Sequence, residues 1–346
     1  MANTIQHKRG TAADWTSADP TLAAGQIGVE TDTGKFKFGD GSTAWSGLGY
    51  FETAEAVAAW TFQGSNYGYT SGGVPFSNVI DKFPFAVDAN ATDVGDLTAG
   101  NEQPSGQSSA ESGYTSGGYD GSPTTYTSVI DKFPFASDAN AANVGNLSQI
   151  VYQNQGNSSS ENGYSVGGTT PGTTNVSRIN KFSFAADGNA VYSADLYIAQ
   201  RAGSGQSSSE YGYSSSGISP TGLWGTVIQK FPFAADTNAT DVGDLTTGNF
   251  LTNKGQSSET HGYVTGSRTG FNVQKFSFAS DGNAATYGTV ASSSGAGQSS
   301  TENGFISGGG SNITTIQKFS FVADESPSST GYSLTVGRSQ SAGQQY

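Results

Sequence analysis

Oxygen-bearing side chains recur at close spacing in this chain and could bind a metal ion. The clearest set is Asp88, Asn90, Asp93 and Asp96. Calcium takes roughly six to eight oxygen ligands, but this set lacks the alternating aspartates and the later bidentate glutamate of a dedicated calcium loop. Asx turns, in which the side chain accepts a hydrogen bond from the backbone two residues on, also account for the spacing. We therefore assign the chain no metal and no cofactor.

A second candidate is a lysine that recurs in the motif Lys-Phe-x-Phe. Its copies are Lys82, Lys132, Lys181, Lys230, Lys275 and Lys318. Equivalent lysines could form a cationic ring that binds acidic sugars. Alternatively, each lysine lays its aliphatic stem on apolar surface and bonds its ammonium group to a carboxylate or a carbonyl. The second interpretation is favoured, because core-type residues frame the lysine within its strand.

Residue types that carry catalysis are scarce. The chain has no cysteine and only two histidines, His7 and His261. A Ser-His-Asp set requires closeness in space that the sequence does not establish. The arginines are too scattered for a carboxylate clamp, and no carboxylate pair suited to glycoside hydrolysis stands out in a strand or loop. We therefore expect the protein not to be an enzyme.

The overall charge and hydropathy exclude two further classes of function. The formal net charge is −13, which repels phosphate backbones, so we expect no binding to nucleic acid. The chain has no run of about 18 apolar residues that would predict a membrane-spanning helix. Residues 1–10 lack the apolar segment of a secretory signal. We expect no membrane insertion.

The lysine motif belongs to a repeating unit that organises most of the chain. Successive lysines are spaced by 50, 49, 49, 45 and 43 residues. Asp-x-Asn follows nearly every copy, and a glycine with an aromatic residue behind it precedes every copy. These glycines are Gly68, Gly113, Gly163, Gly212, Gly262 and Gly304. Self-similarity at about 40–50 residues without a helical pattern predicts propeller blades.

Each repeat reads as four short strands separated by Gly and Asn turns, which is typical of a propeller blade. Gly-aromatic-x-x-Gly-Gly forms the second strand, and Val/Ile-x-Lys-Phe-x-Phe forms the third. This order resembles the kelch repeat across residues 61–346, although Phe stands where kelch repeats carry Tyr-Asp. The resemblance implies an all-β fold with a six-bladed kelch-like β-propeller. We expect residues 341–346 to supply the innermost strand of the first blade, because closure removes exposed edges.

The phenylalanines of the third strand have a structural interpretation. Alternation along residues 79–85 puts Phe83 and Phe85 on one face of the strand. We interpret them as core between stacked blades, where each buried ring stabilises the fold by roughly 1.5–3 kcal/mol.

Residues 1–51 differ in composition from the repeats. Alternation and turn residues predict short strands at residues 4–8, 26–31 and 35–38 and a single helical turn at residues 11–15. About 50 residues with few large apolar groups make a poor core alone, and domains of this size often need a partner surface. We therefore expect this module to oligomerise. Residues 52–60 form a linker where the composition shifts.

The same N-terminal module carries a long run of distinctive short motifs. They are Lys8-Arg9-Gly10-Thr11, Leu22-Ala23-Ala24-Gly25-Gln26, Glu30-Thr31-Asp32-Thr33-Gly34 and Lys37-Phe38-Gly39-Asp40-Gly41 with Trp45. The run resembles the N-terminal segment of phage tail-fibre and receptor-binding proteins, including the major tropism determinant N-terminal domain, over roughly residues 3–51. In that family the segment builds an intertwined trimer and helps to join the protein to the virion. The resemblance implies a homotrimer that binds other virion proteins through this module.

Differences between the repeats concentrate in the loop after the second strand. The aromatic residues of these loops are Tyr119, Tyr126, Trp224 and Phe271. Rigid aromatic side chains among Ser, Gly and Asn make good contact surfaces, and variable loops on a fixed scaffold tend to carry function. These residues are our candidates for ligand binding, and ordinary exposed loops are the alternative.

Together these features predict a bacteriophage virion protein in three segments. Residues 1–51 form the attachment and trimerisation module, residues 52–60 the linker and residues 61–346 the propeller. We interpret the protein as a tail fibre or receptor-binding protein that recognises a host cell-surface glycan or protein through the propeller loops. The alternative is a capsid decoration or head-fibre protein without a receptor role. Both interpretations place the protein in the virion, on a tail fibre or on the capsid surface.

Overall fold

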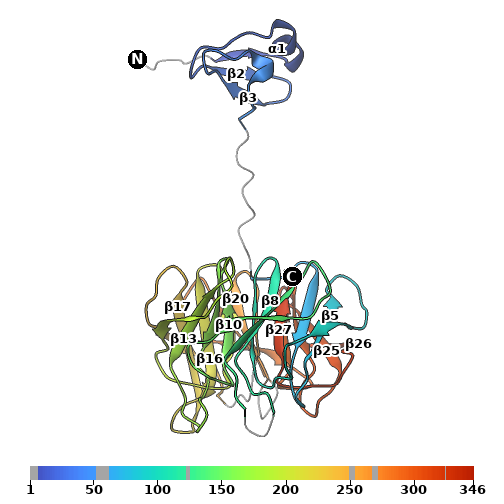
Figure 1. The fold of residues 1–346 in the computed structure, drawn as a ribbon, viewed down its shortest axis with the longest axis vertical. Coiled ribbons are helices and arrows are strands. Elements are labelled where there is room, and N and C mark those ends of the chain that lie inside the picture. The colour runs from blue at the N-terminus through green and yellow to red at the C-terminus, as the bar shows by residue number, and fades with distance from the viewer. Residues whose placement is uncertain (1–6, 52–61, 122–124, 249–253, 267–271, 324) are drawn as a thin grey trace. The chain divides into compact units, whose positions relative to one another are not determined.

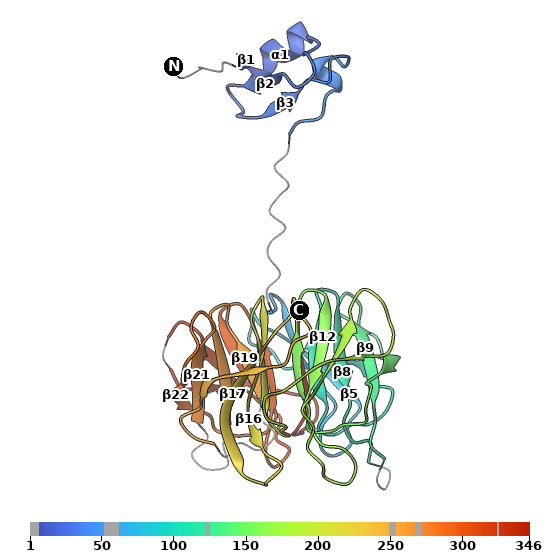
Figure 2. The same cartoon turned by 90° about the vertical axis from the view of Figure 1, so that its left-hand side faces the viewer.

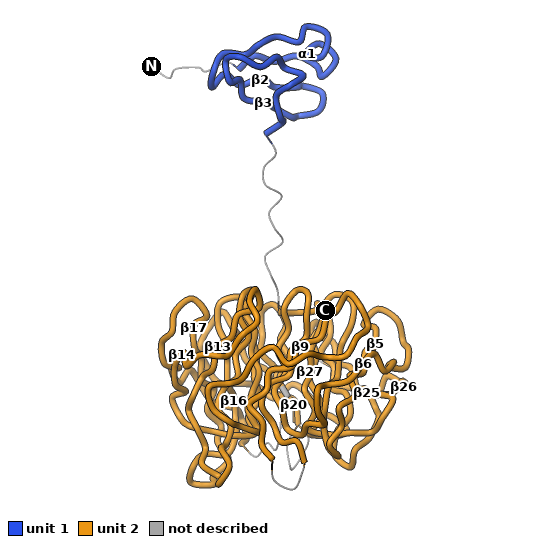
Figure 3. The backbone as a smooth tube through the Cα atoms, in the orientation of Figure 1, with its two compact units in different colours: residues 1–60 blue, residues 61–346 orange. Residues whose placement is uncertain are grey.

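The computed structural model describes residues 7–51, 62–121, 125–248, 254–266, 272–323 and 325–346. The chain divides into two compact units, residues 1–60 and residues 61–346 (Figure 3). Within the described residues no helix is long and apolar enough to cross a membrane. The predicted linker at residues 52–60 lies outside the described residues.

Unit 1 contains a three-stranded sheet in the order β1-β2-β3. β1 pairs with β2 in parallel, and β2 pairs with β3 antiparallel. The elements are β1 (Lys8–Gly10), α1 (Ala12–Ala18), β2 (Ile27–Glu30), β3 (Phe36–Phe38) and the 3-10 turn η1 (Trp45–Gly47). β2 and β3 confirm the strands predicted at residues 26–31 and 35–38.

Two details of unit 1 differ from the sequence predictions. β1 begins at Lys8, where the predicted strand at residues 4–8 ends, and residues 4–6 lie outside the described part. α1 continues beyond the single turn predicted at residues 11–15. A capping box stabilises the start of the helix, in which the Thr11 hydroxyl accepts from the Asp14 backbone N–H and the Asp14 carboxylate accepts from the Thr11 backbone N–H. This exchange satisfies donors that a helix start otherwise leaves unpaired.

A small aromatic core holds unit 1 together. Trp15 of α1 stacks on Trp45 with the ring centroids 4.2 Å apart, and Leu22 completes the buried cluster. β2 passes so close that a Cβ atom on Gly28 would lie 2.6 Å from the Trp45 ring. Lys37 is buried and donates to the Trp45 carbonyl at 2.9 Å. Among the described residues of unit 1 this is a small apolar core.

In unit 2 the described residues form six four-stranded antiparallel sheets, one for each repeat of the sequence. Five of the sheets consist of four consecutive strands. In the remaining sheet the C-terminal strand β27 lies beside β4, β5 and β6, which come from the start of unit 2. The predicted all-β class is therefore confirmed. The predicted pairing of residues 341–346 with the first repeat is also confirmed, because β27 pairs antiparallel with β4.

The strands occupy four equivalent positions in the repeat. The first strands are β27 (Ala342–Gln345), β7 (Ser105–Ser108), β11 (Gln155–Ser158), β15 (Ser204–Ser207), β19 (Lys254–Ser257) and β23 (Ala296–Ser299). The second strands are β4 (Tyr67–Ser71), β8 (Ser112–Ser116), β12 (Asn162–Val166), β16 (Tyr211–Ile218), β20 (His261–Thr265) and β24 (Asn303–Ser307). The third strands are β5 (Val79–Pro84), β9 (Val129–Pro134), β13 (Arg178–Ser183), β17 (Trp224–Pro232), β21 (Asn272–Ser277) and β25 (Thr315–Ser320). The fourth strands are β6 (Thr92–Asp96), β10 (Ala142–Asn146), β14 (Val191–Asp195), β18 (Thr240–Asp244), β22 (Ala285–Thr289) and β26 (Ser328–Ser333).

Successive sheets stand side by side in unit 2 (Figures 1 and 2). Their first strands contact one another in the order β7, β11, β15, β19, β23 and β27, and β27 contacts β7. A buried amide side chain on each first strand donates to a backbone carbonyl on the second strand of the next sheet, over 2.8–3.0 Å. The donor–acceptor pairs are Gln107–Tyr164, Asn157–Tyr213, Gln206–Tyr263, Gln256–Phe305, Gln298–Tyr69 and Gln344–Tyr114. Buried carbonyls need such partners, which explains a Gln or Asn at this interior position.

Aromatic stacks fill the space between the same sheets. The aromatic residue of each second strand stacks on the last phenylalanine of the next sheet's Lys-Phe-x-Phe motif, with ring centroids 4.8–4.9 Å apart. The stacked pairs are Tyr69–Phe135, Tyr114–Phe184, Tyr164–Phe233, Tyr213–Phe278, Tyr263–Phe321 and Phe305–Phe85. The prediction that the phenylalanines form core between repeats is confirmed.

The glycine before each of these aromatic residues is required by the neighbouring third strand. Gly163 pairs directly with Phe182, and a Cβ atom on Gly163 would lie 2.3 Å from the Phe182 ring. The same close approach occurs in every repeat, at 2.2–2.4 Å. Two contacts therefore explain the Gly-aromatic motif. The phenylalanine ring of the neighbouring third strand lies over the glycine, and the aromatic residue packs against the next sheet.

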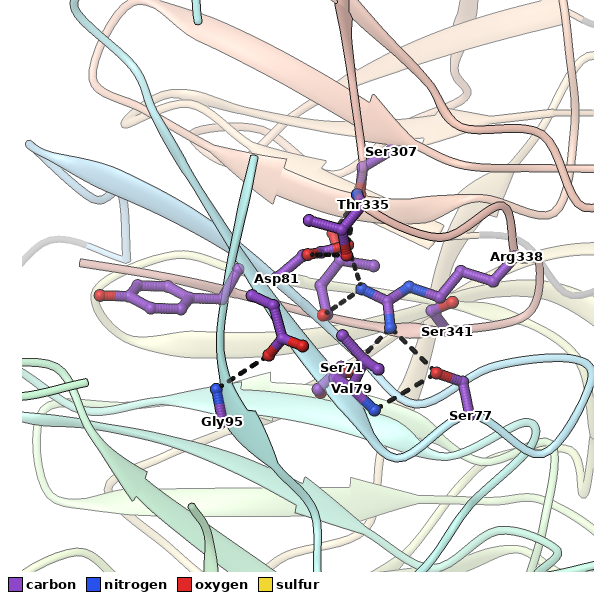
Figure 4. Close-up of polar contacts among 12 residues, drawn as sticks. Ser71, Ser77, Val79, Asp81, Gly95, Ser307, Thr335, Arg338 and Ser341 are labelled. Atoms are coloured by element: carbon purple, nitrogen blue, oxygen red, sulfur yellow. Dashed lines mark hydrogen bonds and ion pairs between the residues drawn. The ribbon is translucent and has the colours of Figure 1, made fainter. Parts of the chain in front are cut away.

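A buried ion pair fastens the segment before β27 to the first repeat (Figure 4). The guanidinium of Arg338 and the carboxylate of Asp81 approach to 2.6 Å, and neither side chain is exposed to solvent. Arg338 also donates to the backbone carbonyls of Val79 and Thr70, at 2.8 and 3.0 Å. Thr335 donates to the second oxygen of Asp81 through its hydroxyl at 2.6 Å. The C-terminal segment is thus held by side chains as well as by strand pairing.

Candidate binding face

The loops before the first strands and the loops after the second strands meet at one end of unit 2. Four backbone bridges join them: Val74 with Ser339, Glu102 with Tyr119, Tyr152 with Thr169 and Arg201 with Ile218. We call this end the loop face. The opposite end carries the C-terminus and the first residues of unit 2, where the Gln345 side chain donates to the Phe62 carbonyl at 2.9 Å. Figures 1 and 2 show the β16–β17 loop and the C-terminus at opposite ends.

A continuous row of four aromatic side chains lies on the loop face. Phe76 contacts Tyr119, Tyr119 contacts Tyr126, and Tyr126 contacts Tyr152, with ring centroids 5.6, 5.2 and 4.7 Å apart. We call these residues the aromatic row. Two of its members, Tyr119 and Tyr126, are sequence-predicted candidates that the structure brings together. Phe76 and Tyr152 were missed, although both are aromatic departures from the repeat and could have been found on that basis.

The other predicted candidates do not join this row. Trp224 begins β17 and pairs with Ile218, in the sheet that follows β11–β14 and not in the sheet of Tyr119. Its neighbour Leu223 is 70% exposed on the β16–β17 loop. Phe271 lies outside the described residues.

Charged groups of both signs flank the aromatic row. At one end the Glu102 carboxylate accepts a hydrogen bond from the Phe76 backbone N–H at 3.1 Å, and burial raises the pKa of this carboxyl group. At the other end Arg201 donates to the Asn175 amide oxygen at 3.2 Å. Burial, followed by the neighbouring Tyr126, raises the pKa of Tyr152, so its hydroxyl stays protonated at neutral pH. The row therefore offers apolar ring surface between polar groups.

Four of the motif lysines bond to aspartates of the next sheet. The pairs are Lys82–Asp138, Lys132–Asp187, Lys181–Asp236 and Lys230–Asp281, at 2.5–2.9 Å. Each of these aspartates is the first residue of an Asp-x-Asn motif. The bonds support the interpretation that the ammonium groups serve the fold, since a neighbouring carboxylate already compensates each of the four charges.

The asparagine of the Asp-x-Asn motif has a second bridging role. The Asn140 side-chain oxygen accepts from the Asp96 backbone N–H of the preceding sheet at 3.0 Å, and Asn90 does the same with Ser333. The expectation of an Asx turn is therefore wrong for Asn90. It is confirmed for Asp93, which accepts from the Gly95 backbone N–H at 3.2 Å. Among the described residues no cluster of three or more His, Asp or Glu side chains is arranged to hold a metal ion.

Two cavities among the described residues of unit 2 lie away from the aromatic row. One, of about 40 Å³, is lined mostly by glycines in or next to the first strands, and it is too small for a sugar ring. The strands around it approach so closely that a Cβ atom on Gly156 would lie 2.0 Å from the Gly106 carbonyl oxygen. A hollow of about 390 Å³ lies at the opposite end from the loop face, between the turns that carry Glu161 and Glu210. The turns that line this hollow have similar sequences in other repeats, so the hollow follows from the repeat structure.

Comparison with known proteins finds similarity in the N-terminal segment. The family model of the major tropism determinant N-terminal domain matches residues 5–43. Hyaluronoglucosaminidases of the Streptococcus pyogenes phages H4489A and H10403 are 50% and 48% identical to this chain over 46 residues. The alignments cover 13% of this chain and 12% and 14% of those relatives, so the chain spans about an eighth of their length. They assign no hyaluronoglucosaminidase activity to unit 2.

The family match confirms the resemblance predicted for the N-terminal module. It extends over elements β1 to β3, which build the small sheet of unit 1. The matched relatives are both encoded by bacteriophages. The comparisons thus support a virion-associated structural or tail protein of a phage.

Proposed function

We propose that the chain is a phage receptor-binding or tail-fibre protein whose loop face binds the host cell surface. The aromatic row is the observation that carries this proposal, because it places side chains that the repeat does not require at one end of unit 2. Hydrophobic side chains that serve the fold lie between the sheets, whereas these lie in the loops. Surfaces of this composition are typical of recognition sites.

For unit 2 we infer a six-bladed, kelch-like β-propeller. The contact order of the first strands supports this architecture, because β27 contacts both β23 and β7. The amide bonds and aromatic stacks support it in the same way, since each set links every sheet to the next and returns to the first. In such an arrangement every sheet packs between two others, and only short, protected strand edges remain.

For unit 1 we infer a homotrimer that attaches to other virion proteins. The small core supports this, and so do aromatic side chains left on its surface: Phe38 is 43% exposed and Phe51 is 49% exposed. Trimerisation would present three loop faces together and raise avidity without new contacts. Light scattering of the intact protein is expected to give three times the chain mass, and a monomer mass would contradict the inference.

Adsorption to bacterial cells tests the receptor role. Fluorescently labelled full-length protein is expected to bind host cells saturably, and antibody to unit 2 is expected to label the tail of the virion. A folded protein that does not adsorb, with label spread over the head, would favour the decoration alternative. Release of reducing sugar from the cells would instead point to an enzyme.

A further inference from the structure

The aromatic row occupies backbone positions that other repeats fill with different residues. Tyr119 bridges Glu102 on one side and Tyr126 on the other. In the next repeat the same pair of bridges is made by Thr169, with Tyr152 and Asn175. The backbone geometry therefore forms with threonine and asparagine as well as with tyrosine. The bridging pattern itself therefore does not require tyrosine at positions 119 and 126.

Phe76 gives a second, independent indication that the row has a role outside the fold. Its φ angle is +40°, a left-handed conformation that bulky residues rarely adopt. Phe76 is 43% exposed, so burial of its ring offsets this conformational cost only in part. The ring lies over Gly121, where a Cβ atom would come within 2.0 Å of it. Strained residues that persist at a surface tend to mark ligand contacts.

We propose that the aromatic row is a carbohydrate-binding platform that takes a neutral oligosaccharide. The apolar C–H faces of successive sugar rings would pack along Phe76, Tyr119, Tyr126 and Tyr152. The sugar hydroxyls would meet Glu102 at one end, Arg201 at the other and the tyrosine hydroxyls between them. This assignment rests on the proposed host-binding function and names the ligand class of that same face.

Size and charge favour a sugar over a protein partner. A stable protein interface buries about 800 Å² on each partner, whereas this row is four side chains long and three of them are only partly exposed. A sugar chain is narrow and has apolar C–H faces and polar hydroxyl edges. The aromatic row likewise has apolar rings with polar groups at its two ends. The formal net charge of −13 and the carboxylate of Glu102 make an acidic sugar the less suitable ligand.

Titration of the full-length protein with defined sugars tests the proposal. The probes are tetrasaccharides of glucose, galactose, N-acetylglucosamine and rhamnose, followed by calorimetry at millimolar concentration. At least one is expected to bind, and Tyr126→Ala and Phe76→Ala are each expected to weaken it by about tenfold, as for a central contact residue. Leu223→Ala removes an exposed apolar side chain on the same face and is the control, with affinity expected to be unchanged. Melting curves establish that every variant is folded.

Some outcomes overturn the platform and leave the proposed function intact. If the protein adsorbs to host cells but binds none of the four sugars, the sugar assignment is wrong. If sugar binding survives both row variants, the site lies elsewhere. If proteinase treatment of the cells abolishes adsorption and periodate treatment does not, the partner is a protein. Conversely, row-dependent sugar binding without adsorption to host cells supports the platform and refutes the receptor role.

Discussion

Replacing Arg338 with methionine tests how the two ends of unit 2 are joined. The substitution keeps most of the aliphatic volume but leaves the Asp81 carboxylate buried without its cation, since both side chains are fully shielded from solvent. Removing one partner of a buried pair typically costs about 3–5 kcal/mol, because the remaining charge is uncompensated. At roughly 2–4 °C per kcal/mol, the melting temperature of unit 2 should fall by about 6–20 °C.

A double variant separates the ion pair from general damage. Another repeat has Asn180 at the position equivalent to Asp81. The Ser148 backbone N–H donates to the Asn180 amide oxygen, as the Thr335 backbone N–H donates to the Asp81 carboxylate. Asp81→Asn in the Arg338→Met background removes the buried charge and keeps that acceptor. We expect it to recover more than half of the lost stability, although the carbonyls of Val79 and Thr70 still lack their donor.

Thermal and urea unfolding of the full-length protein, followed by circular dichroism, supply the measurement. Arg201→Met is the matched control, because Arg201 also precedes a first strand but is only partly buried and bonds to a neutral side chain. It should change stability by no more than about 0.5 kcal/mol. The reasoning would be refuted if Arg338→Met matched this control, or if the double variant were no more stable than the single one.

Further substitutions test other parts of the scaffold. Gly163→Ala places a Cβ atom 2.3 Å from the Phe182 ring and should destabilise unit 2 by about 1–3 kcal/mol in urea unfolding. Lys132→Ala should cost less than about 1 kcal/mol, because its partner Asp187 is 55% exposed, and the loss should shrink in high salt. Deleting residues 336–346 removes β27 with Arg338 and should lower the melting temperature sharply. Burial raises the pKa of Asp131 above its unfolded-state value, so folding favours its protonated form; that stabilisation is present at low pH and is lost as pH rises through the folded-state pKa. Asp131→Asn should therefore melt higher than wild type near pH 7, with the difference shrinking towards pH 4.

Repetition made the scaffold predictable from sequence. Periodic Gly-aromatic and Lys-Phe-x-Phe motifs recover the second and third strand of every described sheet, because those residues serve the same contact in each repeat. The closing strand was predictable for the same reason, since residues 338–344 repeat the pattern of residues 201–206. The partners of these residues were harder to predict. Asp138 bonds to Lys82 across 56 positions of sequence, and the spacing of the motifs alone does not indicate which sheet supplies the partner.

The aromatic row was only half predictable for a related reason. Tyr119 and Tyr126 share one loop, so their closeness follows from chain connectivity. Phe76 and Tyr152 reach them from two different repeats, and those contacts depend on the bridges of the loop face. In unit 1 the start of α1 is predictable from a Thr-x-x-Asp capping box at Thr11 and Asp14, whereas its end at Ala18 lies beyond the single predicted turn.

In a repeat protein, residues that serve the fold can be distinguished from other residues by comparing the repeats. Whatever recurs in every repeat, such as the buried amides, the stacked rings and the glycines beneath them, is explained by contacts between neighbouring sheets. A small set of residues is not explained by these recurring contacts. Arg338 with Asp81 joins the segment before β27 to the first sheet of unit 2. The aromatic row lies in loops that other repeats build with other residue types, and Phe76 keeps a partly exposed ring at φ +40°, a conformation that costs free energy. The proposed binding role would account for that cost, whereas selection for stability alone would favour its removal.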